Sequence, residues 1–260
     1  MIKRILIITV AVCAVLFAAT VARGDIVDQS VVYTVNNQPY EGYFIKNEGF
    51  GDRQPIVLLI HDWNGIDDYE QRRAQMLAEQ GYATFAVDLY GQGVRPATVE
   101  ESREESNKLY SDRQAMRDRL FAGLATAQTM AGVDPEQVAA IGYCFGGAAA
   151  LEFARAGADL DGFVSFHGGL GTPDDQDYSQ VKGSVLILHG ADDPVAPIAE
   201  VAALAEAMTT ANVDYDMEIY GGARHSFTVW GADQDASRYD AQADIKSWRA
   251  MLDFFEAQLR

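Results

Sequence analysis

A short glycine-rich segment carries the clearest chemistry in this sequence. Residues 142–147 read Gly-Tyr-Cys-Phe-Gly-Gly, so that Cys144 stands in a Gly-x-Cys-x-Gly pattern between an apolar run, 138–141, and a small-residue segment, 148–156. The glycines permit a sharp turn from strand to helix that exposes the central residue. A sulfur at a helix N-terminus is favoured as thiolate by the dipole and the free N–H groups. The pattern predicts Cys144 as a nucleophile, and the alternative is a small buried cysteine in a glycine-rich turn.

A nucleophile of this kind needs a base and an acid, and chain order selects them. In α/β-hydrolases the order is nucleophile, acid, histidine, with the acid in a loop after a late strand. Beyond Cys144, the segment His-Gly-Ala-Asp-Asp-Pro offers Asp192 and Asp193, and His225 lies further on. We favour Asp193, which is the third residue after the glycine and directly precedes the proline. The predicted catalytic residues are therefore Cys144, Asp193 and His225.

The other three histidines are expected to be structural. His61, His167 and His189 each end an expected strand, where hydrogen bonding to the backbone is the simplest role. Metal binding by His61, Asp62 and His189 would be an alternative, but no His pair at i,i+4 and no Cys pair supports it. We expect no metal and no cofactor.

Several motifs together resemble one known family. The sequence is similar to the dienelactone hydrolases, small α/β-hydrolases that use Cys instead of Ser, and the similarity spans most of the chain after residue 25. The segments that carry it are His61-Asp62-Trp63-Asn64-Gly65, Asp88-Leu89-Tyr90-Gly91, Gly142 to Gly147, Gly190-Ala191-Asp192-Asp193-Pro194 and Arg224-His225-Ser226-Phe227.

The resemblance implies a reaction and its machinery. It implies a Cys144-His225-Asp193 triad, an oxyanion hole from the backbone N–H groups of Phe145 and Trp63, and hydrolysis of esters or lactones through a thioester. Asp62 stands where the family commonly has a glutamate that helps to generate the thiolate. Because aspartate is one methylene shorter, that modulation is expected to be weaker or to pass through water.

The expected substrate pocket differs from that of the dienelactone enzymes, which hold a substrate carboxylate with two arginines. Gln92 and Val229 occupy those places here, and Arg95 is the candidate substitute for the first arginine. We therefore expect a pocket suited to a neutral ester. Its expected lining is Trp63, Tyr90, Arg95, Tyr143, Phe145, Phe227 and Trp230. The alternative for Trp63, Tyr90, Phe145, Phe227 and Trp230 is that each is an ordinary core aromatic.

Apolar and amphipathic segments alternate along the chain, which predicts an α/β fold: an α/β-hydrolase with a mostly parallel central sheet flanked by helices. A hairpin is expected first, with strands at 31–35 and 40–45 around a turn at 36–39. Further strands are expected at 56–60, 83–87, 138–141, 163–166, 185–188 and 215–220. Two helices are expected where apolar residues recur at spacings of three and four. One contains Val201, Leu204 and Met208, and the other, the last in the chain, contains Ile245, Trp248, Leu252, Phe255 and Leu259 on one apolar face. Charges dominate 99–119, which we interpret as a solvated helical face.

The N-terminus resembles a targeting segment. Lys3 and Arg4 precede an uncharged apolar run, 5–19, which is typical of a secretory signal peptide, with an uncleaved anchor as the alternative. We expect residues 1–24 to be the signal and residues 25–260 to be one α/β-hydrolase domain. The protein would then be secreted or periplasmic, without stable membrane insertion after cleavage.

Composition restricts the partners. Asp and Glu number 38 against 20 Lys and Arg, giving a formal charge of −18, so nucleic acid is not an expected partner. The sequence predicts a hydrolase of small-molecule esters or lactones and does not predict the oligomeric state. Two alternatives are a non-catalytic ligand-binding homologue and a thiol redox sensor, since Cys144 is the only cysteine after residue 13.

Overall fold

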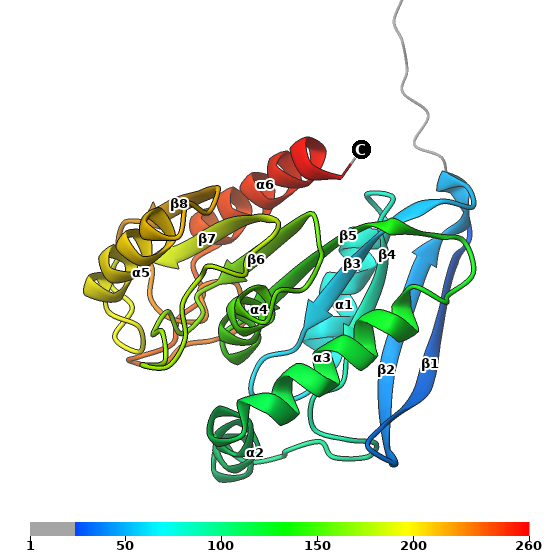
Figure 1. The fold of residues 1–260 in the computed structure, drawn as a ribbon, viewed down its shortest axis with the longest axis horizontal. Coiled ribbons are helices and arrows are strands. Elements are labelled where there is room, and N and C mark those ends of the chain that lie inside the picture. Colours follow the sequence, from blue (N-terminus) through cyan, green and yellow to red (C-terminus); the bar gives the residue numbers. More distant parts are fainter. Residues whose placement is uncertain (1–23, 260) are drawn as a thin grey trace, which may run out of the picture.

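One twisted sheet organises the computed structural model, which describes residues 24–259 (Figure 1). Its eight strands lie in the order β1-β2-β4-β3-β5-β6-β7-β8. The strands β3 to β8 run parallel to one another. The strand β2 is antiparallel to both of its neighbours, β1 and β4. The strand bounds are β1 (Ile26–Val35), β2 (Gln38–Asn47), β3 (Gln54–Ile60), β4 (Ala83–Val87), β5 (Val133–Tyr143), β6 (Gly162–Phe166), β7 (Ser184–Gly190) and β8 (Tyr215–Tyr220).

The N-terminal hairpin closes more tightly than the sequence predicted. Only Asn36 and Asn37 form the loop, with φ of 50° and 63°, and Val35 pairs with Gln38. Two consecutive residues with positive φ suit the right-handed twist of a two-residue hairpin, and asparagine tolerates that conformation. Gln38 and Pro39, expected in the turn, already belong to β2.

Helices cover both faces of the sheet (Figure 1). One apolar layer joins the sheet to α2 (Val99–Ser111), α3 (Arg113–Ala127), α4 (Phe145–Arg155) and α5 (Ile198–Thr210). The other joins it to α1 (Asp68–Ala78) and α6 (Ala241–Gln258). A short 3-10 helix, η1 (Glu48–Phe50), follows β2. The α/β-hydrolase architecture predicted from the sequence is confirmed.

The charged stretch 99–119 forms α2 and the first half of α3. Leu109 of α2 and Met116 and Leu120 of α3 are buried in one apolar layer with residues of the sheet. The capping box of Thr98 and Glu101 starts α2, and the Asp112 side chain caps α3. The expected solvated face is thus one side of two helices that also contribute to the core.

The last helix packs on most of the stripe that its spacing predicted. Phe255 and Leu259 are buried, and Trp248 and Leu252 pack half-buried against the same layer. Ile245, in contrast, is 47% exposed, so it does not belong to the buried face. Asp244 is buried instead, because its carboxylate pairs with Arg73 of α1 at 2.7 Å. A buried ion pair therefore sets the rotation of α6 at its N-terminal end.

No helix in residues 24–259 is long and apolar enough to cross a membrane. The expected signal peptide falls on residues 1–24, and residues 1–23 lie outside the described part of the chain.

Candidate active site

Cys144 occupies a strained turn between β5 and α4. Its φ of 53° and ψ of −115° lie outside the regions that side chains normally adopt, a feature that concentrates at functional sites. The flanking glycines are required by close backbone contacts. A Cβ on Gly142 would lie 1.9 Å from the Gly146 oxygen, and one on Gly146 would lie 2.2 Å from the Ile60 oxygen. The strand-to-helix turn expected from the spacing is present.

The structure brings the three predicted catalytic residues together. His225 Nε2 lies 3.0 Å from Cys144 Sγ, and His225 Nδ1 lies 2.9 Å from Asp193 Oδ2. The other Asp193 oxygen accepts hydrogen bonds from the backbone N–H groups of Val195 and Ala196. Asp193 is buried and aimed at the imidazole, whereas Asp192 is exposed. Cys144, Asp193 and His225 thus form one hydrogen-bonded chain.

The electrostatics of this chain favour a charged imidazole. Burial by itself lowers the pKa of His225, but attraction to Cys144 and the hydrogen bond to Asp193 raise that pKa to about 10. Burial also opposes ionisation of Asp193, yet its hydrogen bonds to His225 and to two backbone amides hold its pKa below the ordinary value. At neutral pH the arrangement therefore favours an imidazolium that is hydrogen-bonded to the Asp193 carboxylate and in contact with the Cys144 sulfur.

Two backbone N–H groups near the thiol are free of protein partners. Among the described residues, the amides of Phe145 and Trp63 donate no hydrogen bond. The loop that contains Trp63 is fixed from several sides: Tyr90 donates to the Trp63 carbonyl at 3.0 Å, and Asp62 Oδ1 accepts from the Asn64 amide at 2.7 Å. Both N–H groups can therefore donate to a ligand, and hydrogen bonds fix the backbone of the Trp63 loop.

Asp62 lies buried beside this group of residues. Burial raises its pKa to about 7, even though the Asn64 amide and the charge of His225 both favour the carboxylate. Its own backbone N–H donates to Glu70, a fully buried carboxyl whose pKa is raised by burial and by the nearby acids. Asp62 therefore titrates near neutral pH, in the range where a proton acceptor is most useful.

The remaining histidines are hydrogen-bonded at strand ends. His61 Nδ1 donates to the Asp62 carbonyl at 2.5 Å, and its Nε2 accepts from the Leu89 amide. His189 Nε2 donates to the Ala196 carbonyl at 2.8 Å.

His167 lies closer to the nucleophile than the sequence indicated. Its Nδ1 accepts from the Cys144 amide at 3.2 Å, and its Nε2 lies 2.7 Å from Thr228 Oγ1. Burial and the charge of His225 hold its pKa well below the ordinary value, so His167 is neutral. His167 therefore binds the backbone of the turn, whereas the thiol contacts His225.

Several expected pocket residues lie near the thiol. Phe145 and Tyr90 are close to each other, with ring centroids 6.0 Å apart, and Trp63 is half-buried in the same apolar layer. Tyr110 of α2 also lies here, although it was not among the expected pocket residues, and its ring contacts that of Phe145 edge-on with centroids 5.3 Å apart. The one signal for it was an aromatic side chain at the end of an otherwise charged segment.

Two expected pocket residues are core residues instead. Tyr143 and Phe227 are fully buried in the layer that faces α1 and α6, so neither has surface to offer a substrate. Tyr143 follows Ala139 and Ile141 onto that face, because side chains alternate along a strand. Their assignment to the pocket was wrong, and the period of two could have excluded Tyr143.

Trp230 and Arg95 lie at the surface but are engaged by protein groups. Trp230 is 41% exposed and covers the guanidinium of Arg73 at 4.3 Å. Arg95 donates to the carbonyls of Val94, Gly91 and Glu41, and lies 3.8 Å from Asp88. Its guanidinium is thus turned to the backbone, and its use as a substrate clamp would require breaking these contacts.

The fold and the turn at Cys144 define an α/β-hydrolase, and comparison with known proteins narrows the class. The family model described as "Dienelactone hydrolase family" matches residues 40–259. The chain belongs to this family.

Relatives cover nearly the whole chain. A protein of Synechocystis sp. with the provisional name carboxymethylenebutenolidase is 28% identical over 248 residues, covering 89% of this chain and 98% of the relative. The solved structure of a dienelactone hydrolase-like promiscuous phosphotriesterase from metagenomic libraries is 33% identical, with a TM-score of 0.85, covering 91% of this chain and all (100%) of that one. A structure named m3DLH matches with 34% identity and the same TM-score and coverage. Family membership supports hydrolysis of esters or lactones.

Proposed function

We propose that this protein hydrolyses carboxylic esters or lactones through a thioester on Cys144, with His225 and Asp193 as its catalytic partners. The observation that carries the proposal is the 3.0 Å contact between Cys144 Sγ and His225 Nε2 at a strained strand-to-helix turn. A nucleophile within hydrogen-bond reach of a base, itself oriented by a carboxylate, is the arrangement that covalent acyl transfer requires.

The first half-reaction starts at the contact between Cys144 and His225. The raised pKa of His225 favours a proton on its imidazole, which takes the thiol proton as the sulfur attacks the carbonyl carbon. The developing oxyanion is received by the amides of Phe145 and Trp63, and one such donor typically contributes about 3 kcal/mol to transition-state stabilisation. The imidazolium then gives its proton to the departing alkoxide, which leaves a thioester and a neutral His225.

The second half-reaction uses the neutral imidazole as the base. Once Cys144 is acylated, the thiolate charge that raised the pKa of His225 is gone. His225 then takes a proton from water, which attacks the thioester carbonyl and releases the acid and the thiolate. A thiolate is a good leaving group, so activated esters and lactones suit this site better than amides.

The direct test is turnover of a neutral aryl ester by protein alkylated at Cys144. A hydrolase loses its activity on alkylation. A ligand-binding homologue or a redox sensor would show no turnover before the treatment.

Asp62 is expected to control the acid side of the pH profile. Because its pKa is raised to about 7, it becomes a carboxylate only as the pH rises through that value, and its negative charge then stabilises the imidazolium of His225. We predict that kcat/KM of the wild type rises through an inflection near pH 7 and that Asp62→Asn lacks this inflection.

The control for this measurement is Asp67→Asn. Asp67 contributes to the field at Asp62 and caps α1 from an exposed position, so its variant should keep the inflection and move it slightly to lower pH. An unchanged inflection in Asp62→Asn would assign it to another group and contradict the role of Asp62.

Substrate charge should matter. With Gln92 and Val229 at the places of the two carboxylate clamps and Arg95 bound to backbone carbonyls, a substrate carboxylate has no ready cationic partner. An unpaired buried charge costs several kcal/mol. We predict that kcat/KM for a neutral short-chain ester or lactone exceeds that for a dienelactone carboxylate at least about tenfold, or 1.4 kcal/mol.

The Arg95→Ala variant decides whether this arginine takes part. The preference for neutral substrates should be the same in the wild type and in Arg95→Ala. A wild type that prefers the anion, with the preference lost in the variant, would show that Arg95 leaves its carbonyl partners to bind substrate.

We also propose that residues 1–24 are a cleaved signal peptide, that residues 25–260 form the mature hydrolase domain, and that the protein works outside the cytoplasm. This proposal is supported by the basic start and the uncharged apolar run.

A further inference from the structure

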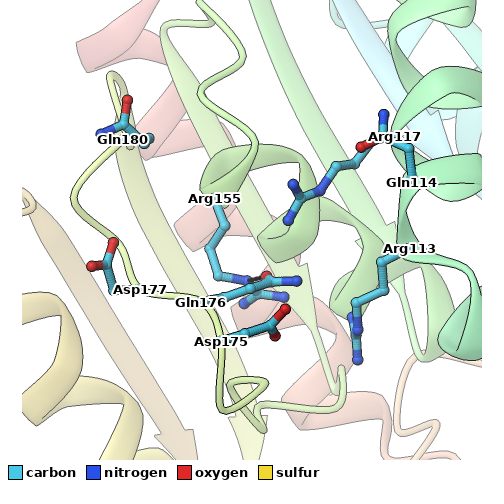
Figure 2. A pocket seen from close by; sticks show the side chains of 8 residues that line it. All are labelled: Arg113, Gln114, Arg117, Arg155, Asp175, Gln176, Asp177 and Gln180. Carbon is cyan, nitrogen blue, oxygen red and sulfur yellow. Dashed lines mark hydrogen bonds between the residues drawn. The ribbon is translucent and has the colours of Figure 1, made fainter.

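A cavity of about 420 Å³ lies between α3, the C-terminal half of α4 and the loop before β7 (Figure 2). Arg113 and Arg117 extend into it from α3, and Arg155 extends from α4. The cavity is distinct from the site of the thiol. Glu152, on which the arginines converge, is eight residues beyond Cys144 on α4, about 12 Å along the helix.

The three guanidinium groups share a single buried carboxylate. Glu152 Oε1 accepts from Arg117 Nε at 2.7 Å, and Glu152 Oε2 accepts from Arg113 at 2.8 Å and from Arg155 at 2.9 Å. Burial opposes ionisation of Glu152, but the arginines hold its pKa below the ordinary value. Arginine keeps its charge at any physiological pH. The three guanidinium groups in direct contact with Glu152 therefore carry three positive charges against the single negative charge of its carboxylate.

Two of the arginines keep unused donors. The hydrogen bonds and ion pairs in the described part of the chain engage Nη1 of Arg113 and Nε and Nη2 of Arg117. Nε and Nη2 of Arg113 and Nη1 of Arg117 have no partner there, and both side chains are 26% exposed. Arg155, in contrast, is buried and donates hydrogen bonds to Gln176, Tyr178 and Glu152.

The aspartates at the rim do not neutralise the excess charge by contact. Asp175 and Asp177 line the cavity on its loop side, and neither pairs with the three arginines in residues 24–259. The Asp177 carboxylate accepts instead from the amide and hydroxyl groups of Ser179. The chain as a whole carries a charge of −18, so a basic composition does not explain the cluster.

We propose that this cavity is a binding site for a small, doubly charged oxyanion, either a phosphate or a short dicarboxylate. Free N–H groups on two neighbouring guanidiniums match the oxygens of such a ligand, and charge-assisted hydrogen bonds of this kind are the strong ones. The ligand would supply the negative charge that Glu152 alone does not. The cavity volume falls within the range of small-molecule sites. The proposal does not depend on the esterase reaction.

The test is calorimetric titration of the protein with inorganic phosphate and, separately, with succinate. Ionic strength is held constant with chloride, and Cys144 is alkylated so that the thiol site does not contribute. We expect saturable binding of at least one of the two anions, and the responsive anion identifies the ligand class. Arg113→Gln and Arg117→Gln should each weaken it at least about tenfold, the loss expected for one charge-assisted hydrogen bond.

Two further variants keep the test decisive. Arg103→Gln removes an exposed arginine from the neighbouring α2 and should leave the affinity unchanged. Glu152→Gln removes the competing carboxylate and should tighten binding about tenfold, which is opposite to the effect of a general loss of structure. Absence of saturable binding by both anions, an equal loss in Arg103→Gln, or weaker binding in Glu152→Gln would overturn the proposal.

Discussion

Replacing Cys144 or His225 by alanine is expected to lower kcat/KM for a neutral aryl ester at least about a thousandfold, or about 4 kcal/mol. Without the sulfur no covalent intermediate forms. Without the imidazole no group donates a proton to the leaving alkoxide, and no group accepts a proton from the attacking water. The two losses should not add, because the residues act as a unit through the 3.0 Å contact.

The aspartate assignment is tested in the same assay. Asp193→Asn keeps the shape but removes the charge that orients and stabilises the imidazolium, so a similarly large loss is expected. Asp192→Asn is the matched control, because Asp192 is exposed and its neighbour makes the contact with His225. A larger loss in Asp192→Asn than in Asp193→Asn would contradict the assignment, and thermal melting of each variant separates lost chemistry from lost structure.

The largest effect on stability is expected at Arg73. Its guanidinium is buried, donates to the Thr228 carbonyl at 2.6 Å and to Asp244 at 2.7 Å, and lies within 5.6 Å of the ring centroids of Tyr69, Tyr143, Trp230 and Trp248. Arg73→Leu leaves the Asp244 carboxylate buried without its partner. We predict a loss of about 3–5 kcal/mol in the free energy of unfolding, measured by denaturant titration.

Two controls distinguish the ion pair from the loss of any arginine on α1. Arg72→Leu, at the exposed neighbouring position, should change stability by less than about 0.5 kcal/mol. The double variant Arg73→Leu with Asp244→Asn should recover part of the loss, because no charge is then left buried. If Arg73→Leu is no more destabilising than Arg72→Leu, the buried pair does not stabilise the fold.

Local patterns in the sequence determined the elements and the order of the reactive residues. Gly142 could be interpreted without a structure, because a Cβ there would meet the Gly146 oxygen of the same turn. Gly146 could not, because a Cβ there would meet the Ile60 oxygen of β3. Apolar runs of strand length predicted the parallel strands, since strands covered on both faces are apolar throughout. The preference for Asp193 over Asp192 rested on the same kind of local argument, and Asp193 is the one that contacts His225.

The surroundings of the thiol were decided only by tertiary structure. Tyr143 and Phe227 face the α1 and α6 layer, Arg95 is held by backbone carbonyls, and Tyr110 comes over Phe145 from another helix. Each of these facts depends on which face of an element packs against a partner distant in the sequence. The same holds for the pKa of Asp62 and for the three arginines on Glu152: the sequence states which charges exist, but burial and distance decide what those charges do.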